Sequence, residues 1–333
     1  MKKISLAAFA IGLLSSGQVS AQDITLKFSV FTPEQEITYQ QAMLPWARAV
    51  EEASGGKVKI QMFPGGTLGR DGSKQIKMLK DGVADIAFII PAYNPGLFPD
   101  NWVTELPATS NSALEGSVAF WRMLQDGRLR GYDDLEVIST FVTSPYLVHS
   151  TKPISSIEDI KGLKMRTAGP LEQGCVELLG GVPVGMPIGK AAESLARGVV
   201  EGIALHYPAL FAFGVADATP YHYHNAFGSI PFGFVMDKAK FEALPEEVRD
   251  IMHEKGGEAL ARIFGAAMDA EGEKRLAQVQ ADPKQSVVIP SEEDRAKWGE
   301  AMSNCSATYV AAQDRGGDLQ TTWVEALGKL RAN

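Results

Sequence analysis

Strand-like and helix-like segments alternate along this chain, and their order constrains the fold more than any other feature. Strand-like segments, with alternating apolar and polar residues or a short apolar run between turn residues, lie at 24–31, 57–63, 84–90, 135–142, 163–167, 182–186 and 199–207. Helix-like segments lie between them at 42–50, 71–81, 156–161, 171–179 and 190–196. Repeated β-α-β order with short connections predicts an α/β fold in which helices cover a sheet.

A much longer helix is expected towards the C-terminus. Pro245-Glu246-Glu247 is typical of a helix start, because Pro fits the first turn and acidic residues favour the positive end of the helix dipole. Apolar residues then recur at three- and four-residue spacing, and the pattern allows the helix to reach Gln280. Gly256-Gly257, Gly265 and Gly272 weaken it and predict bends. Because 333 residues are enough for two lobes, we expect this helix to span both.

The N-terminus has the features of a secretory signal peptide. Lys2 and Lys3 precede an apolar run from Ile4 to Leu14, which is too short to cross a bilayer. Small residues follow, and Val19-Ser20-Ala21 fits the rule for signal peptidase. Residues 1–21 are therefore predicted to be a signal peptide cleaved after Ala21, which places the mature protein in the periplasm.

The charge of the chain bears on its partners. The formal net charge is -8, and no basic cluster is present, which argues against nucleic acid or anionic lipid as a partner. An anionic ligand remains compatible, because solvent screens distant charges and one local arginine can outweigh them.

Only two cysteines are present, Cys175 and Cys305. In an oxidising periplasm they could form a disulfide that closes a long loop. The alternative is two buried thiols that act as small apolar groups. Since the sequence does not give the distance between them, the thiols are favoured by a small margin.

Several segments, in this order, together resemble one known family. They are Phe63-Pro64-Gly65-Gly66-Thr67-Leu68-Gly69, Leu79 to Ile86, Lys152-Pro153-Ile154, Glu158 to Arg166, Val182-Pro183, Met186-Pro187, Leu195 to Gly202 and Phe241 to Val248. The ordered set resembles the DctP-type substrate-binding proteins of tripartite ATP-independent periplasmic (TRAP) transporters. No single segment carries this resemblance, which covers nearly the whole mature chain.

The resemblance implies a two-lobed periplasmic binding protein of the Venus-flytrap type, with crossing strands and a long helix joining the α/β lobes. We expect lobe I to comprise 22–143 plus 232–271, and lobe II 144–231 plus 272–333. The resemblance also implies a small organic acid as ligand, TRAP membrane permease subunits as partners, a monomer and no cofactor. It assigns the ligand carboxylate to Arg166, whose planar guanidinium matches a carboxylate with two parallel hydrogen bonds.

Departures from the family pattern bear on the ligand. Thr143 to Leu147 carries no second cation, the asparagine expected after Glu201-Gly202 is replaced in the stretch Ile203 to Pro208, and Ile188 stands where an aromatic residue is common. A buried second carboxylate without a partner would cost several kcal/mol. An apolar or aromatic monocarboxylate is therefore favoured, and a C4-dicarboxylate or a uronate or other hydroxy acid is the alternative. Besides Arg166, the predicted ligand-binding residues are Phe31, Tyr93, Tyr146, Ala168, Met186, His206, Tyr207 and Phe232.

Two other functions are weighed against transport binding. His222 and His224 alternate along a strand and could reach one zinc ion, as in a periplasmic metal-dependent hydrolase. No third ligand pattern lies nearby, and no GxSxG, HExxH or paired-carboxylate motif occurs, so neither a metal site nor an enzyme is predicted. A sensory binding subunit that reports to a receptor would share the same ligand site.

Overall fold

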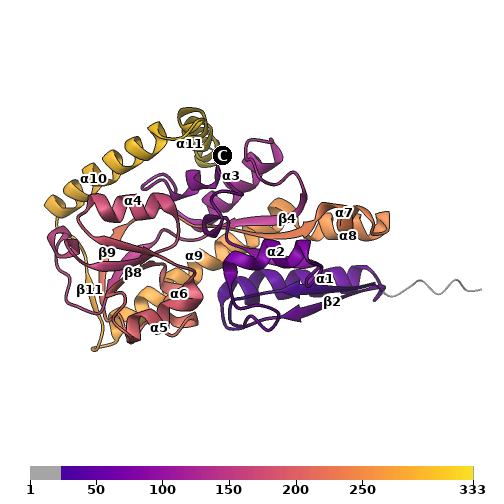
Figure 1. Ribbon diagram of the computed structural model, residues 1–333, viewed down its shortest axis with the longest axis horizontal. Coiled ribbons are helices and arrows are strands. Elements are labelled where there is room, and N and C mark those ends of the chain that lie inside the picture. The colour runs from indigo at the N-terminus through magenta and orange to yellow at the C-terminus, as the bar shows by residue number, and fades with distance from the viewer. Residues whose placement is uncertain (1–23, 333) are drawn as a thin grey trace, which may run out of the picture.

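The computed structural model describes residues 24–332, which form two β-sheets covered by helices (Figure 1). The strands are β1 (Ile24–Ser29), β2 (Val58–Phe63), β3 (Ile86–Ile89), β4 (Leu135–Val142), β5 (Leu147–Ser150), β6 (Lys164–Thr167), β7 (Val182–Gly185), β8 (Gly202–Leu205), β9 (Tyr221–Ala226), β10 (Pro231–Asp237) and β11 (Ser286–Val288). The α-helices are α1 (Leu44–Ala53), α2 (Gln75–Lys80), α3 (Ala113–Gln125), α4 (Pro170–Leu178), α5 (Ala191–Ala196), α6 (Tyr207–Ala212), α7 (Lys238–Glu242), α8 (Glu246–Lys255), α9 (Gly257–Ala281), α10 (Glu292–Ala311) and α11 (Gly316–Arg331).

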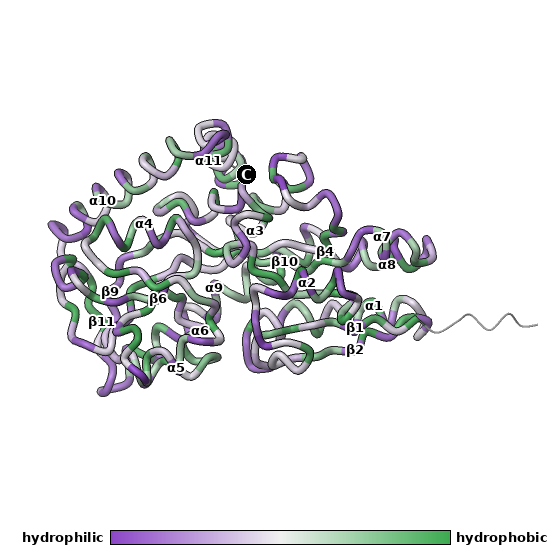
Figure 2. The backbone as a smooth tube through the Cα atoms, in the orientation of Figure 1, coloured by the Kyte–Doolittle hydropathy of each residue, from purple (hydrophilic) through white to green (hydrophobic). Residues whose placement is uncertain are grey.

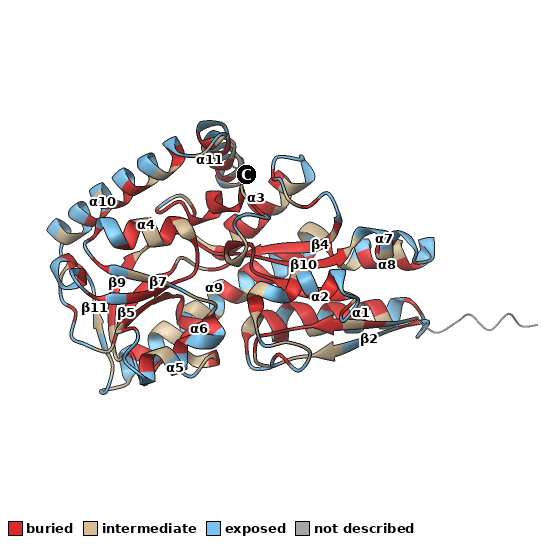
Figure 3. Cartoon of the chain, viewed as in Figure 1, coloured by how far each residue is buried: buried red, intermediate tan, exposed pale blue. Residues whose placement is uncertain are grey.

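The first lobe is built around a five-stranded sheet in the order β2-β1-β3-β10-β4. β1 pairs in parallel with β2 and β3, whereas β10 is antiparallel to both β3 and β4. Its core is aromatic, because Phe28, Phe88 and Phe141 each pack against the ring of Phe234. The strands of this sheet are mostly apolar (Figure 2), and β4 and β10 are buried along most of their length (Figure 3).

The second lobe is built around a six-stranded sheet in the order β11-β9-β5-β8-β6-β7. β6 lies between the parallel strands β7 and β8, so the carboxyl ends of all three meet at one edge of the sheet. β5 is antiparallel to β8 and β9, and β11 pairs in parallel with β9. This common edge is where α/β sheets present residues to ligands.

Two segments cross between the sheets. Residues 143–146 lead from β4 to β5, and residues 227–230 lead from β9 to β10. The crossings run side by side: the Phe227 N–H donates to the Tyr146 carbonyl at 2.8 Å, and the Tyr146 N–H donates to the Gly228 carbonyl at 3.0 Å. A glycine at 228 is required here, because a Cβ would lie 2.6 Å from the Cα of Glu105.

The long helical segment is present and is interrupted at Gly256-Gly257. α8 ends at Lys255, and α9 begins at Gly257, whose φ of +63° suits only glycine well. The predicted bend at Gly256-Gly257 is therefore confirmed, whereas at Gly265 and Gly272 the helix is not interrupted, because α9 continues through both. Gly265 instead permits close packing, since a Cβ there would lie 2.5 Å from the Leu114 Cα in α3. α9 contacts α3 and β4 of the first lobe and α6 and β11 of the second.

Some element boundaries differ from the sequence predictions. The strand expected over 199–207 ends at Leu205, because Pro208 starts a helix and Tyr207 becomes its first residue. The signal peptide over 1–21 lies outside the described residues. The predicted lobe boundaries remain predictions; α11, at the C-terminal end, contacts α3 of the first lobe.

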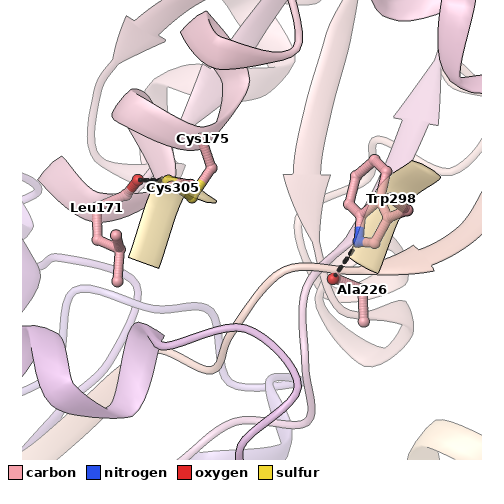
Figure 4. The surroundings of a disulfide bond; sticks show 5 residues. All are labelled: Leu171, Cys175, Ala226, Trp298 and Cys305. Carbon is pink, nitrogen blue, oxygen red and sulfur yellow. Dashed lines mark hydrogen bonds between the residues drawn. A yellow bond between two sulfur atoms is a disulfide. The ribbon is translucent and has the colours of Figure 1, made fainter. Parts of the chain in front are cut away.

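Cys175 and Cys305 form a disulfide with Cα atoms 5.3 Å apart, so the prediction of two buried thiols was wrong. The bond joins α4 to α10. Trp298, also on α10, donates from its indole N–H to the Ala226 carbonyl at the end of β9, at 2.8 Å (Figure 4). Pairing depends on how α10 folds back onto α4, which a sequence separation of 130 does not reveal. Over residues 24–332, no helix has both the length and the apolar character needed to cross a membrane.

Candidate functional site

Arg166 lies on β6, at the edge where the parallel strands of the second lobe end. Its side chain is fully buried, with 0% of its surface exposed. The Nε donates to the Met186 carbonyl at 3.0 Å, and Nη1 donates to the Ala204 carbonyl at 3.4 Å. Nη2 donates to the Tyr93 hydroxyl at 3.2 Å. The guanidinium is thus held in one orientation by strands on both sides of it.

No ion pair between residues 24–332 includes Arg166. A buried cation without an anionic partner is unfavourable, and two carbonyls with one hydroxyl offset only part of the lost hydration. Arginine stays protonated under all ordinary conditions. The site is therefore electrostatically suited to an anion, and the N–H donors of Arg166 that these three bonds do not use suit a carboxylate in particular.

Tyr93 brings the first lobe to this arginine. It ends a short 3-10 turn, Pro91–Tyr93, directly after β3. Its hydroxyl accepts one hydrogen bond from Arg166 Nη2 and another, at 3.0 Å, from the Ile188 backbone N–H. Burial raises the pKa of this hydroxyl, while the charge of Arg166 opposes the rise. One oxygen atom of the first lobe thus contacts two donors of the second.

Aromatic rings from the first lobe form a wall next to Tyr93. Phe31 stacks on Phe88 with centroids 5.3 Å apart, and lies 6.4 Å from the Tyr93 ring. Phe232 meets Phe88 edge-on at 5.2 Å. Gly72 leaves room for this wall, because a Cβ there would lie 3.0 Å from the Phe31 ring. Three residues of the predicted list, Phe31, Tyr93 and Phe232, therefore belong to one cluster of aromatic rings.

Tyr146 and His206 lie in the second part of the site. Both are buried, and their rings lie 5.5 Å apart. Burial, and the charge of Arg166, lower the pKa of His206 to about 3, so its ring is neutral near pH 7. Burial raises the pKa of Tyr146, and the Arg166 charge acts in the opposite direction. His206 Nδ1 has no hydrogen-bond partner among the described residues and is available to a ligand group.

The remaining predicted residues have different surroundings. Ala168 and Met186 lie at the same strand edge as Arg166, where their backbone atoms bond to Glu172 and Arg166. The Tyr207 ring packs against two histidines, with centroids 5.3 Å from that of His149 and 6.2 Å from that of His224. It also lines one cavity together with His206, and its role in ligand binding stays a prediction.

The paired histidines do not form a metal site. His222 Nδ1 lies 2.7 Å from His149 Nδ1, and its Nε2 lies 2.8 Å from the Gln285 amide oxygen. Both ring nitrogens of His222 are thus engaged within the protein. Among residues 24–332, no group of three His, Cys, Asp or Glu side chains could hold a metal ion.

Two buried carboxyl groups near Arg166 were not predicted. Glu172 Oε2 accepts the Ala168 N–H at 2.5 Å, and burial raises the pKa of Glu172 to about 7. Glu105 lies beside it, with its pKa raised well above the usual value by burial and by Glu172. Glu172 is at the third position of a helix, where acidic residues commonly reach back to cap the first turn, and this signal could have identified it. No sequence signal identifies Glu105.

Two α/β lobes, two crossing segments and a spanning helix, with a buried guanidinium where the lobes meet, define a two-lobed ligand-binding protein. Residues 28–313 match the DctP family, described as bacterial extracellular solute-binding protein, family 7. The chain therefore belongs to this family, the solute-binding proteins of TRAP transporters, as the sequence predicted. Proteins of this family bind small organic acids for membrane permease components and are not enzymes, so the metal-dependent hydrolase is set aside.

Similar solved structures cover nearly the whole fold. A TRAP solute-binding protein from a marine metagenome, specific for aromatic acid ligands and bound to 3-hydroxybenzoate, is 27% identical with a TM-score of 0.87, over 92% of this chain and 99% of that chain. One from Rhodoferax ferrireducens T118 with copurified benzoate is 27% identical with a TM-score of 0.87, over 93% and 99%. The 2,3-diketo-L-gulonate-binding periplasmic protein YiaO of Escherichia coli is 21% identical, over 96% of this chain and 97% of that protein.

Proposed function

We propose that this protein is the periplasmic receptor of a TRAP transporter for an aromatic or other apolar monocarboxylate, with Arg166 binding the carboxylate. The observation that carries the proposal is the full burial of Arg166 without an ion pair among the described residues. An anionic ligand would supply the missing charge and form charge-assisted hydrogen bonds to the guanidinium.

The surroundings of Arg166 favour one carboxylate and an apolar body. The rings of Phe31, Phe88 and Phe232 give the site an aromatic wall, and no second cation stands in the crossing segment 143–146. Apolar walls with a few fixed polar groups are typical of sites for small organic ligands. The two relatives solved with benzoate and 3-hydroxybenzoate, each 27% identical, support the same class of ligand.

A hydroxy acid is the second candidate. His206 Nδ1 is unpartnered among the described residues, and Tyr146 lies next to it, so the two could bond the hydroxyl groups of a uronate or keto acid. The E. coli relative is named for a sugar-derived keto acid. A C4-dicarboxylate is less suited, because its second carboxylate would lack a cationic partner.

We further propose how the ligand is held and delivered. The ligand enters between the lobes, and closure moves Tyr93 onto Arg166 and Ile188. Exclusion of water strengthens the ion pair, while the crossing segments absorb the change in backbone angles. A signal peptide cleaved after Ala21 exports the chain to the periplasm. The closed monomer then docks on the membrane permease.

A ligand screen with two Arg166 variants tests this function. Thermal shift is measured with benzoate, 3-hydroxybenzoate, succinate, a keto acid and galacturonate, and affinities of the hits by calorimetry. We expect aromatic acids to give the largest shifts. Arg166→Ala should weaken binding about 100-fold or more. Arg166→Lys should keep only part of the wild-type affinity, because lysine lacks the planar pair of donors. Arg197→Ala, at an exposed i,i+4 ion pair, is the control and should bind normally. Wild-type affinity in Arg166→Ala would refute the site.

A further inference from the structure

Two buried carboxyl groups, one from each lobe, meet at the beginning of α4. Glu105 ends the 3-10 helix Asn101–Glu105 of the first lobe and is 3% exposed. Glu172 lies in the first turn of α4, in the second lobe, and is 4% exposed. Neither takes part in an ion pair within residues 24–332. Buried carboxyl groups without a cationic partner are rare and call for an explanation.

The backbone around Gly169 brings the two groups together. The Glu105 carboxyl lies directly over Gly169, so close that a Cβ on this residue would be 2.6 Å from the carboxyl carbon. Glu105 accepts the backbone N–H of Glu172, and Glu172 Oε2 accepts that of Ala168. Both carboxyl groups therefore bond the same turn, at the positive end of the α4 dipole.

Each group keeps one oxygen atom without a partner among the described residues. These atoms are Oε2 of Glu105 and Oε1 of Glu172, and both are buried. Two neighbouring carboxylates in the interior repel each other, and protonation of one supplies a donor and removes the repulsion. The raised pKa values of both groups, caused first by burial, agree with this arrangement.

Arg166 is the cation that acts on this pair. Its charge lowers the pKa of Glu172, against the effect of burial. The other titratable groups that face the pair are three tyrosine hydroxyls. Tyr93 lies in the turn after β3, Tyr146 in the first crossing segment and Tyr309 on α10. Asp100, directly before the same 3-10 helix, forms ion pairs with Arg130 and Arg315.

We propose that Glu105 and Glu172 form a proton-binding site coupled to Arg166, so that the protein takes up its anionic ligand together with a proton. This inference rests on the proposed function. A ligand carboxylate at Arg166 offsets the positive charge that keeps Glu172 ionised, and lobe closure removes the pair from water. Both effects favour protonation, so the bound state holds more protons than the free state.

Proton uptake can be measured directly in the wild-type protein. Benzoate is titrated into the protein by calorimetry at pH 7 in buffers of different ionisation enthalpy. The slope of the observed binding enthalpy against the ionisation enthalpy of the buffer gives the number of protons bound per ligand. We expect a positive uptake of up to about one proton per ligand, because the carboxyl groups are more ionised while the open site is in contact with water. Affinity should also rise as the pH falls from 8 to 6. If another acid is the best ligand, it replaces benzoate as the probe.

Three variants assign the effect. Glu172→Gln and Glu105→Gln should each remove most of the uptake, because an amide is isosteric but does not titrate. In Glu172→Gln the amide oxygen would still accept the Ala168 N–H. Glu177→Gln, on the exposed side of the same helix, should leave the uptake unchanged.

The outcomes separate the two proposals. If the wild type binds its ligand without taking up a proton, the proton site is overturned and the receptor function stays intact. The proton site is also overturned if both glutamine variants bind ligand with unchanged proton uptake. If no carboxylate binds at all, the receptor function fails, and the proton site fails with it.

Discussion

The Tyr93 hydroxyl is the atom through which the first lobe reaches the buried arginine. It accepts from Arg166 Nη2 and from the Ile188 N–H, and both donors belong to the second lobe. A hydroxyl that accepts twice keeps its own hydrogen free to donate. Tyr93 can therefore hold the lobes together and still bond a ligand oxygen.

Replacing Tyr93 with Phe tests this role. The ring and its packing on Phe31 remain, but the buried Ile188 N–H loses its partner, which costs about 1–3 kcal/mol in the closed form. We expect affinity for the best acid to fall roughly tenfold or more, measured by calorimetry. Tyr132→Phe removes another buried hydroxyl bond, to Asn101, and is the control that should lower stability without lowering affinity. Equal affinity in Tyr93→Phe and wild type would contradict the role.

His206 gives a second prediction, about stability and pH. Its pKa is lowered to about 3 in the folded chain, against about 6.5 when unfolded, so the unfolded state binds more protons below pH 6.5. The folded state therefore loses stability as the pH falls, by about 2 kcal/mol between pH 8 and pH 5 from this residue. Urea unfolding should show a smaller loss in His206→Gln than in the wild type. The exposed His253→Gln should behave as wild type, and an equal loss in all three proteins would refute the assignment.

The sequence predicted part of the candidate site, and the reason differs between residues. Phe31 and Tyr93 follow the parallel strands β1 and β3 of the first sheet, and Arg166 lies near the end of β6 in the second sheet. The hydrogen bond between Tyr93 and Arg166 joins these two sheet edges. Proximity to His206 also predicts Tyr207. The two residues line one cavity, and the helix that begins at Tyr207 places its ring against His149 as well. Glu105 could not be found, because only the contact between two lobes brings it to Gly169.

At the level of elements, glycines show what a local pattern cannot distinguish. Gly257 breaks the long helical segment because its φ is positive, whereas Gly265 lies within α9 and allows α3 to approach. All such glycines weaken a helical pattern equally in the sequence. Only the packing partner, which comes from far along the chain, decides whether a glycine bends a helix or permits a close contact.

Gly169, directly before α4, and Gly174, inside it, provide a matched test of the position of Glu105. A Cβ on Gly169, before the helix, would collide with the Glu105 carboxyl, so Gly169→Ala should destabilise the protein by about 1–3 kcal/mol. Gly174 lies inside the same helix, and no atom lies within 4 Å of the place that a Cβ would occupy. Gly174→Ala should stabilise the protein by about 0.5–1 kcal/mol, because alanine favours helix. Urea unfolding of both variants checks the pair, and equal effects would argue against the position of Glu105.

On the scale of the molecule, the order of the strands in each sheet could not be predicted from the sequence pattern. The β-α-β rhythm predicted an α/β sheet covered by helices, and the parallel pairing of β1 with β2 and β3, and of β6 with β7 and β8, is typical of that order. β10 joins the first sheet after the chain has built most of the second. Its partners β3 and β4 are distant in sequence, and no local periodicity encodes such a pairing. The family resemblance, rather than periodicity, supplied the two-lobed arrangement.

The C-terminal helices add a connection between the lobes that depends on the disulfide. α10 is bonded to α4 through Cys175 and Cys305, and α11, which follows, packs against α3 of the first lobe. In the unfolded chain the bond closes a loop with a sequence separation of 130, so its loss increases the entropy of that state. The double variant Cys175→Ala/Cys305→Ala should lose about 5 kcal/mol of unfolding free energy.

Urea denaturation of the wild type, oxidised and reduced, and of this double variant measures the contribution. The reduced wild type should match the variant, since both lack the covalent link, and the oxidised protein should unfold at a higher urea concentration. Neither cysteine contacts Arg166, so ligand affinity measured well below the unfolding midpoint should stay the same. A variant as stable as the oxidised protein would mean that α10 is held on α4 by its side-chain packing and the Trp298 hydrogen bond alone.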